Sequence, residues 1–235
     1  ADDGKAIGAM TSNAASVMTL NPTDGIIYVS AEGAGLQDGS SWSDATPYLQ
    51  YAVAQANTFN PIAEVWVQAG TYYGDNVVGN NAFNIVEGVN VYGGFAGTET
   101  SLEQRNYETN VTILDGQNSQ RVLYQDKAYT EATATVWDGF TIQNGGGNIY
   151  AGRGAWIKDY GTLRNCVIKN NGSETLSTTT EIKGGGVYVE GGTMDNCKVY
   201  GNVLKNDKSG YLRGAGVYMS EGRIVDCEIY GNENY

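Results

Sequence analysis

The side chains of this chain that could carry out a reaction are carboxylates. The sequence holds no histidine, which excludes a Ser-His-Asp triad, a Cys-His pair and any zinc site with histidine ligands. Two carboxylates could still cleave a glycosidic bond, one as acid and one as base or nucleophile. The weak catalytic candidates are Asp115, Asp138 and Asp195. Asp115 and Asp138 each precede a glycine, as turn-forming aspartates do, so the simpler interpretation of these residues is structural.

The three cysteines are the other reactive side chains. Cys166, Cys197 and Cys227 lie 31 and 30 residues apart, each between apolar residues. One thiol per interval in an apolar setting predicts reduced core cysteines stacked on one another, rather than a metal site or a disulfide. We therefore expect no metal site and no cofactor, with calcium on surface carboxylates left open.

These residues belong to a repeat that occurs three times. The copies are 153–171, 184–202 and 214–232, and they align without a gap. Each copy holds short apolar runs that are rich in β-branched and aromatic residues and are bounded by glycine and asparagine, which predicts strands. A period near 30 residues predicts stacked units that share one core, and therefore an all-β solenoid.

The repeat also predicts columns of equivalent residues, one on each rung. The columns predicted to point inward are Leu163/Met194/Ile224, Cys166/Cys197/Cys227, Ile168/Val199/Ile229 and Trp156/Val187/Val217. Two further columns are predicted at the turns, with glycines in positive φ at Gly161/Gly192/Gly222 and asparagines that hydrogen-bond to the next rung at Asn171/Asn202/Asn232. Lys158 interrupts an otherwise apolar column and indicates a local bend in the first copy.

Tyrosines recur beside the inward positions, so alternation along the strand should point them outward. The candidate ligand-binding residues are Tyr188, Tyr200, Tyr211, Tyr218 and Tyr230. Exposed tyrosines beside asparagine and aspartate are suited to sugar rings. The alternative is a tyrosine ladder that packs and shields the sheet.

The chain divides into three parts. Residues 1–25 are small and polar and are predicted to be a linker or mobile arm, and residues 26–62 form an amino-terminal cap. The cap holds a helix over about 47–58, where Thr46-Pro47 is a helix start and the apolar face covers the end of the solenoid. Residues 63–235 form the β-helix, with regular repeats from about 136. The chain stops just after a repeat, which predicts a truncated solenoid or an end that pairs with another molecule.

Two insertions, 172–183 and 203–213, leave the repeats at the same register. Insertions at one register project from one side of a solenoid, and that side is often the binding face. We expect the two insertions to lie side by side, one rung apart.

The net charge of −12 disfavours nucleic acid as a partner, since nucleic-acid binding needs a basic stripe. The sequence also holds no apolar run long enough to span a bilayer. The sequence gives no prediction of oligomeric state.

Several stretches of the cap and first turns carry a resemblance to a known family. They are Tyr28-Val29, Asp38-Gly-Ser-Ser-Trp42, Val65-Trp-Val-Gln-Ala-Gly-Thr-Tyr72, Val91-Tyr-Gly-Gly-Phe-Ala-Gly97, Gln104-Arg-Asn106 and Thr112-Ile-Leu-Asp-Gly116. They resemble the exported right-handed parallel β-helix proteins of gut Bacteroidales. They are also similar to the repeats of polymorphic outer-membrane proteins and adhesins and to the pectate-lyase-like superfamily.

The resemblance implies a right-handed parallel β-helix with an amino-terminal capping helix. It also implies export, either to the cell surface and outer membrane or to the extracellular space. The fold alone does not select an activity. The function predicted first is recognition of a polysaccharide or host-surface glycan without catalysis. The alternatives are a polysaccharide lyase or glycoside hydrolase and a structural stalk.

Overall fold

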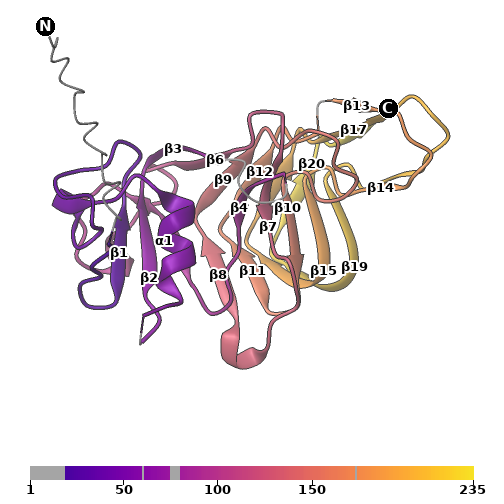
Figure 1. Ribbon diagram of the computed structural model, residues 1–235. Coiled ribbons are helices and arrows are strands. Elements are labelled where there is room, and N and C mark those ends of the chain that lie inside the picture. The colour runs from indigo at the N-terminus through magenta and orange to yellow at the C-terminus, as the bar shows by residue number, and fades with distance from the viewer. Residues whose placement is uncertain (1–18, 60, 75–79, 173) are drawn as a thin grey trace, which may run out of the picture.

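The computed structural model describes residues 19–59, 61–74, 80–172 and 174–235. It is a parallel β-helix, in which strands from successive turns stack on three faces (Figure 1). The first face contains β1 (Ile26–Val29), β2 (Glu64–Gln68), β5 (Val91–Phe95), β8 (Thr135–Asp138), β11 (Gly161–Arg164) and the second halves of β15 (Val187–Asp195) and β19 (Val217–Val225).

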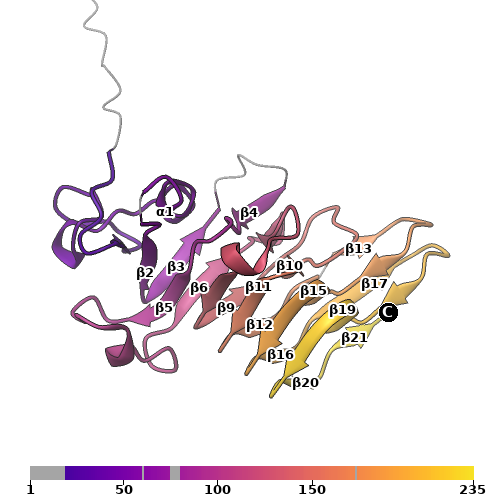
Figure 2. The same ribbon diagram turned by 90° about the horizontal axis from the view of Figure 1, so that it is seen from below.

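The other two faces are built in the same way. The second face contains β3 (Gly70–Tyr73), β6 (Thr112–Asp115), β9 (Phe140–Gln143), β12 (Val167–Lys169), β16 (Lys198–Tyr200) and β20 (Glu228–Tyr230). The third face contains β4 (Asn81–Asn84), β7 (Arg121–Tyr124), β10 (Ala155–Lys158) and the first halves of β15 and β19. Figure 2 shows the second face as a series of parallel strands along the solenoid.

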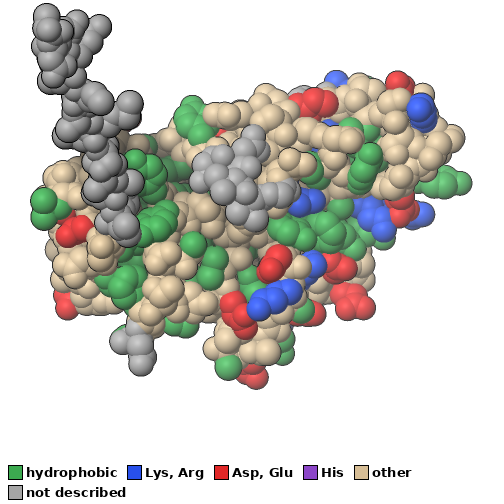
Figure 3. Space-filling model, viewed as in Figure 1, with side chains coloured by type: hydrophobic (Ala, Val, Ile, Leu, Met, Phe, Trp, Pro, Cys, Tyr) green, Lys and Arg blue, Asp and Glu red, His purple; other side chains and the backbone are tan. Residues whose placement is uncertain are grey.

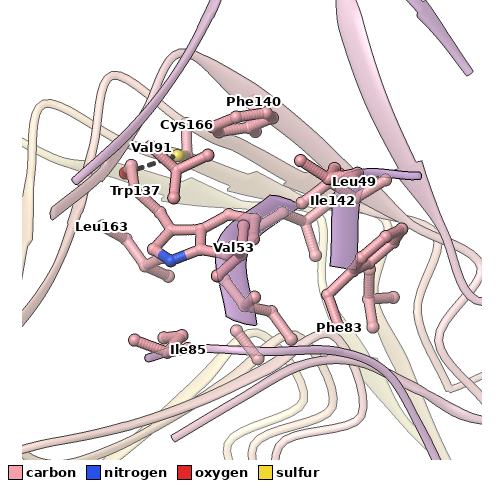
Figure 4. Close-up of a cluster of buried hydrophobic side chains, with 14 of the residues drawn as sticks. Leu49, Val53, Phe83, Ile85, Val91, Trp137, Phe140, Ile142, Leu163 and Cys166 are labelled. Carbon is pink, nitrogen blue, oxygen red and sulfur yellow. Dashed lines mark hydrogen bonds between the residues drawn. The ribbon is translucent and has the colours of Figure 1, made fainter. Parts of the chain in front are cut away.

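The amino-terminal end is closed by α1 (Leu49–Ala56), which confirms the predicted capping helix. Leu49, Ala52, Val53 and Ala56 are buried, with exposures of 3% or less. Figure 4 shows Leu49 and Val53 in one cluster with Phe83, Ile85 and Trp137 from inside the solenoid. The open edge of β4 is also covered, because the Gln50 side chain accepts a 2.6 Å hydrogen bond from the Asn84 N–H.

The predicted helix start at Thr46-Pro47 is wrong by about two residues. The N-cap is Tyr48, whose side chain makes no capping hydrogen bond, and Thr46 instead bridges Val29 of β1 in parallel. Of the predicted arm 1–25, residues 1–18 lie outside the described chain, and Leu20 is buried in the core. The described connections contain three short 3-10 helices, at Trp42–Asp44, Leu102–Gln104 and Glu131–Thr133.

Three of the four predicted inward columns lie inside the solenoid. Leu163, Met194, Ile168 and Val199 are fully buried. In the third copy, Ile224 packs against the same core, whereas Ile229 on the last rung is 47% exposed. All three cysteines are free, as predicted; Cys166 and Cys197 are buried and Cys227 is partly buried. Hydrogen bonds with neighbouring thiols, and then burial, raise the pKa of the Cys197 and Cys227 side chains, which keeps both protonated.

The predicted asparagine column is confirmed as a hydrogen-bonded ladder. Asn171 donates through Nδ2 to Oδ1 of Asn202 at 2.8 Å, and Asn202 donates in the same way to Asn232 at 2.9 Å. Asn171 and Asn202 are completely buried. Each link is doubled by a backbone N–H that donates to the same Oδ1, so the ladder holds successive rungs in register.

The gap-free alignment fails in the first half of the first copy. β10 pairs Ala155 with Val187 and Trp156 with Tyr188, so Trp156 does not share the column of Val187 and points outward. A bulge at Lys158 absorbs the one-residue difference. The predicted inward position of Trp156 is therefore wrong, and the bend that Lys158 indicated is the cause.

The predicted glycine column is only partly correct. Positive φ occurs at Gly222, but in the other copies it falls one residue earlier, at Tyr160 and Gly191. Gly192 is required for a different reason: an added Cβ would lie 2.8 Å from the backbone oxygens of Gly161 and Lys158. Close approach of neighbouring rungs, rather than a left-handed turn, explains that glycine.

The two insertions lie side by side, as predicted. β13 (Thr175–Leu176) pairs with β17 (Val203–Asn206), and β14 (Ile182–Lys183) pairs with β18 (Leu212–Arg213). β17 pairs in turn with β21 (Glu233–Asn234). The stacked insertions have a small core of their own and project from the body of the solenoid (Figure 1).

Candidate functional site

The structure does not bring the three candidate aspartates together. Asp115 lies on the second face, whereas Asp138 and Asp195 lie on the first face, two rungs apart, which is roughly 10 Å. Arg164 occupies the rung between Asp138 and Asp195. A basic residue therefore stands where an acid–base pair would need an open space for sugar and water.

Each aspartate is also held by neighbouring groups. Asp115 accepts hydrogen bonds at 2.9 Å from Gln143 and 2.7 Å from Asn144. Asp138 forms a buried ion pair with Arg105, with 2.8 Å between Oδ1 and Nη2. Asp195 pairs with Arg164 at 3.1 Å on the surface. These contacts support the interpretation that the aspartates stabilise turns and rungs.

The candidate tyrosines separate onto different parts of the molecule. Tyr200 and Tyr230 stack on the second face, with ring centroids 5.2 Å apart and planes nearly parallel. Tyr188 and Tyr218 lie on the third face, with centroids 5.4 Å apart. Tyr211 is on the insertions and is 73% exposed. The structure therefore joins the tyrosines in pairs rather than in one site.

The pair on the third face belongs to a longer aromatic row. Tyr124, Trp156, Tyr188 and Tyr218 occupy the same register on four consecutive rungs. The ring centroids are 5.5, 5.0 and 5.4 Å apart along the row. Tyr188, in the middle, is 8% exposed, whereas the other three rings are partly open to solvent. Figure 3 shows hydrophobic side chains gathered over these strands, with charged side chains around them.

Cations lie against the faces of these rings. The Arg121 guanidinium is 4.6 Å from the Tyr124 ring centre and 5.1 Å from that of Trp156. Lys158 lies 5.2 Å from the Trp156 ring, and Lys183, from the insertion, lies 5.1 Å from the Tyr218 ring. These cation–π contacts help to fix the orientation of the rings.

A cavity of about 530 Å³ lies at the amino-terminal end of the aromatic row. Its wall contains amides, charged groups and aromatic rings: Asn57, Asn81, Asn84, Glu87, Arg121, Tyr124, Asp126, Lys127 and Tyr129, together with Ile85 and Val86. Lys127 pairs with Glu87 at 2.8 Å, and this hydrogen bond lowers the pKa of Glu87 and raises that of Lys127. The cavity thus presents several polar groups beside one aromatic surface, which is the composition of a ligand site.

Comparison with protein-family models, curated proteins and solved structures finds no match.

No described helix is long and apolar enough to cross a bilayer. The described cysteines, aspartates and glutamates form no group of three or more that could hold a metal ion. Calcium on surface carboxylates stays a prediction.

Sequence reasoning missed Tyr124, Trp156 and Arg121. The outward orientation of Trp156 was not predicted because the gap-free alignment placed this residue inward. Aligning Ile157 with Val189 would have corrected the register. Tyr124 lies on a rung of the solenoid whose sequence is only weakly similar to the repeats. It follows Leu123, which is buried, so alternation along the strand predicts that Tyr124 points outward. Nothing in the sequence indicates that Arg121 would lie against this row.

Proposed function

We propose that this protein binds a polysaccharide or host-surface glycan along the third face, without cleaving it. The observation that carries the proposal is the aromatic row of Tyr124, Trp156, Tyr188 and Tyr218, which leads into a polar cavity. Export to the cell surface is part of the proposal and is supported by the sequence resemblance alone.

The dimensions of the row are suited to an extended chain. Rungs repeat about every 4.8 Å, so a linear glycan lying along the solenoid axis would meet the partly exposed rings of Tyr124, Trp156 and Tyr218. Aromatic side chains offer apolar area to the C–H groups of a sugar. The Trp156 indole is held by a 2.9 Å hydrogen bond to Glu190, so its position is fixed before the ligand arrives.

We propose that the protein does not catalyse cleavage because the candidate aspartates are engaged in contacts with neighbouring side chains. Asp115 and Asp138 are buried and bonded to neighbouring side chains, and Asp195 lies beside Arg164. A stalk is the other candidate, favoured by the mutual packing of the rings, since a ladder could stabilise the sheet without binding anything.

A matched pair of variants tests the proposal. Trp156→Ala removes the centre of the row, and Tyr230→Ala removes an exposed ring from the second face. Binding to an immobilised panel of plant and host polysaccharides should weaken at least about tenfold in Trp156→Ala and stay unchanged in Tyr230→Ala. Both variants are first checked for an unaltered β-sheet spectrum. Equal binding by the two variants would contradict the proposal, and release of new reducing ends or unsaturated products would favour the enzyme.

A further inference from the structure

Two arginines are buried in the described chain, and their electrostatic environments differ. Arg153 is fully buried and faces the Glu174 carboxylate at 3.8 Å. Arg121 is 7% exposed and has no carboxylate within ion-pair distance among the described residues. A buried cation without an anion is costly, so its presence at the wall of a cavity calls for an explanation.

Neutral groups hold the Arg121 side chain firmly in place. Nε donates to the Gly152 carbonyl at 2.9 Å, Nη2 to the Ala151 carbonyl at 2.8 Å and Nη1 to Oδ1 of Asn81 at 2.7 Å. Tyr124 and Trp156 flank the guanidinium. A guanidinium has five N–H groups, and each terminal nitrogen keeps one that these bonds do not use. These contacts hold the guanidinium in place at the wall of the cavity.

Arg121 remains a cation at neutral pH. Burial lowers its pKa to about 10, which is still well above physiological values. The other charges of the cavity do not neutralise it: Glu87 is paired with Lys127, and Asp126 is exposed, where water screens its charge. Among the described residues that line the cavity, Arg121 is therefore an oriented positive charge without a carboxylate partner, in a protein whose net charge is −12.

We infer that the cavity binds an anionic group, a carboxylate or a sulfate, on a sugar of the ligand, with Arg121 as its partner. The inference rests on the proposed function and specifies the ligand as an acidic glycan. A planar guanidinium donates two parallel hydrogen bonds to such oxyanions, and charge-assisted bonds of this kind are about twice as strong as neutral ones. Asn84, which is partly exposed, borders the same space and would be the partner of a ring hydroxyl.

Three sugars that differ only at carbon 6 provide the test: glucose, glucuronate and glucose 6-sulfate. Their affinities are measured by titration of the ¹⁵N-labelled protein in solution NMR. We expect the wild-type chain to bind one or both anionic sugars at least about tenfold more tightly than glucose. Comparison of glucuronate with glucose 6-sulfate separates the two sources of negative charge. Equal affinity for all three sugars would overturn the inference.

Variants assign the preference to Arg121. Arg121→Gln should abolish it, and Arg121→Lys, which keeps the charge but not the fork, should retain part of it. Arg223→Gln is the matched control, because it removes one exposed positive charge from the last rung. A preference that persists in Arg121→Gln would overturn the inference. If Arg121→Gln does not fold, the wild-type preference and the response of Arg121→Lys still decide it.

The outcomes also separate this inference from the proposed function. Polysaccharide binding that depends on Trp156 but is equally strong for neutral and anionic sugars would support the proposed function and contradict the role of Arg121. A preference for anionic sugars that depends on Arg121, without any binding of polymers along the row, would support the inference and contradict the proposed function.

Discussion

The second and third faces of the solenoid have the same architecture and different outer surfaces. On the third face, one register reads Asn84, Tyr124, Trp156, Tyr188 and Tyr218. On the second face, the corresponding row is Tyr73, Asp115, Gln143, Lys169, Tyr200 and Tyr230. The row on the third face is aromatic over four consecutive rungs. In the row on the second face, the type of side chain changes at almost every rung.

The difference arises outside the core. Both rows are carried by the same turns and share one buried interior, so the spacing of their side chains is alike. The two rows differ in the residues that point outward. The third face also has the cations and the cavity beside its row. The fold supplies regularly spaced positions, and the residues in them decide what the surface can bind.

The largest expected effect tests whether the two faces share one core. Val53→Asp places an unpaired carboxylate in the buried face of α1 and should lower the free energy of unfolding by roughly 4 kcal/mol or more. Ala54→Asp, one residue away and exposed, is the control. Thermal unfolding should show one transition for the tyrosines of both faces. Separate transitions for the two faces, or equal stability of the two variants, would contradict a core shared by both faces.

A smaller effect is expected from the asparagine ladder. Asn202→Ala removes an amide that donates to Asn232 and accepts from Asn171, and it leaves buried backbone groups unsatisfied. We expect a loss of about 3 kcal/mol in urea unfolding, against less than about 0.5 kcal/mol for the exposed control Lys198→Ala. A loss below about 1 kcal/mol would mean that the apolar columns alone hold the rungs in register.

The smallest effect concerns the insertions. Tyr211 is highly exposed, and the β14 strand beside it carries Lys183 to the end of the aromatic row. Tyr211→Ala should leave stability unchanged and weaken glycan binding by about 1 kcal/mol, as expected for an exposed ring at the edge of a site. Leu36→Ala, exposed near the cap, should leave binding unchanged. Equal binding by both variants would confine the site to the solenoid.

The sequence predicts the scaffold better than the surface. Cysteines, aliphatic columns and Asn171, Asn202 and Asn232 repeat because like residues stack on like residues, so their positions follow from the period. The orientation of Trp156 could not be obtained in this way, because a single-residue bulge reverses inward and outward. The setting of Arg121 depends on side chains and carbonyls from other turns, which no local pattern encodes.

The most direct test of the proposed site is hydroxyl-radical footprinting with a bound glycan. The protein is oxidised with and without a polysaccharide from the binding panel, and modification is quantified at each aromatic residue by mass spectrometry. Binding along the third face predicts protection of Tyr124, Trp156 and Tyr218, with Tyr200 and Tyr230 oxidised as in the free protein. Protection confined to Tyr200 and Tyr230, or no change on the aromatic row at saturating ligand, would contradict it.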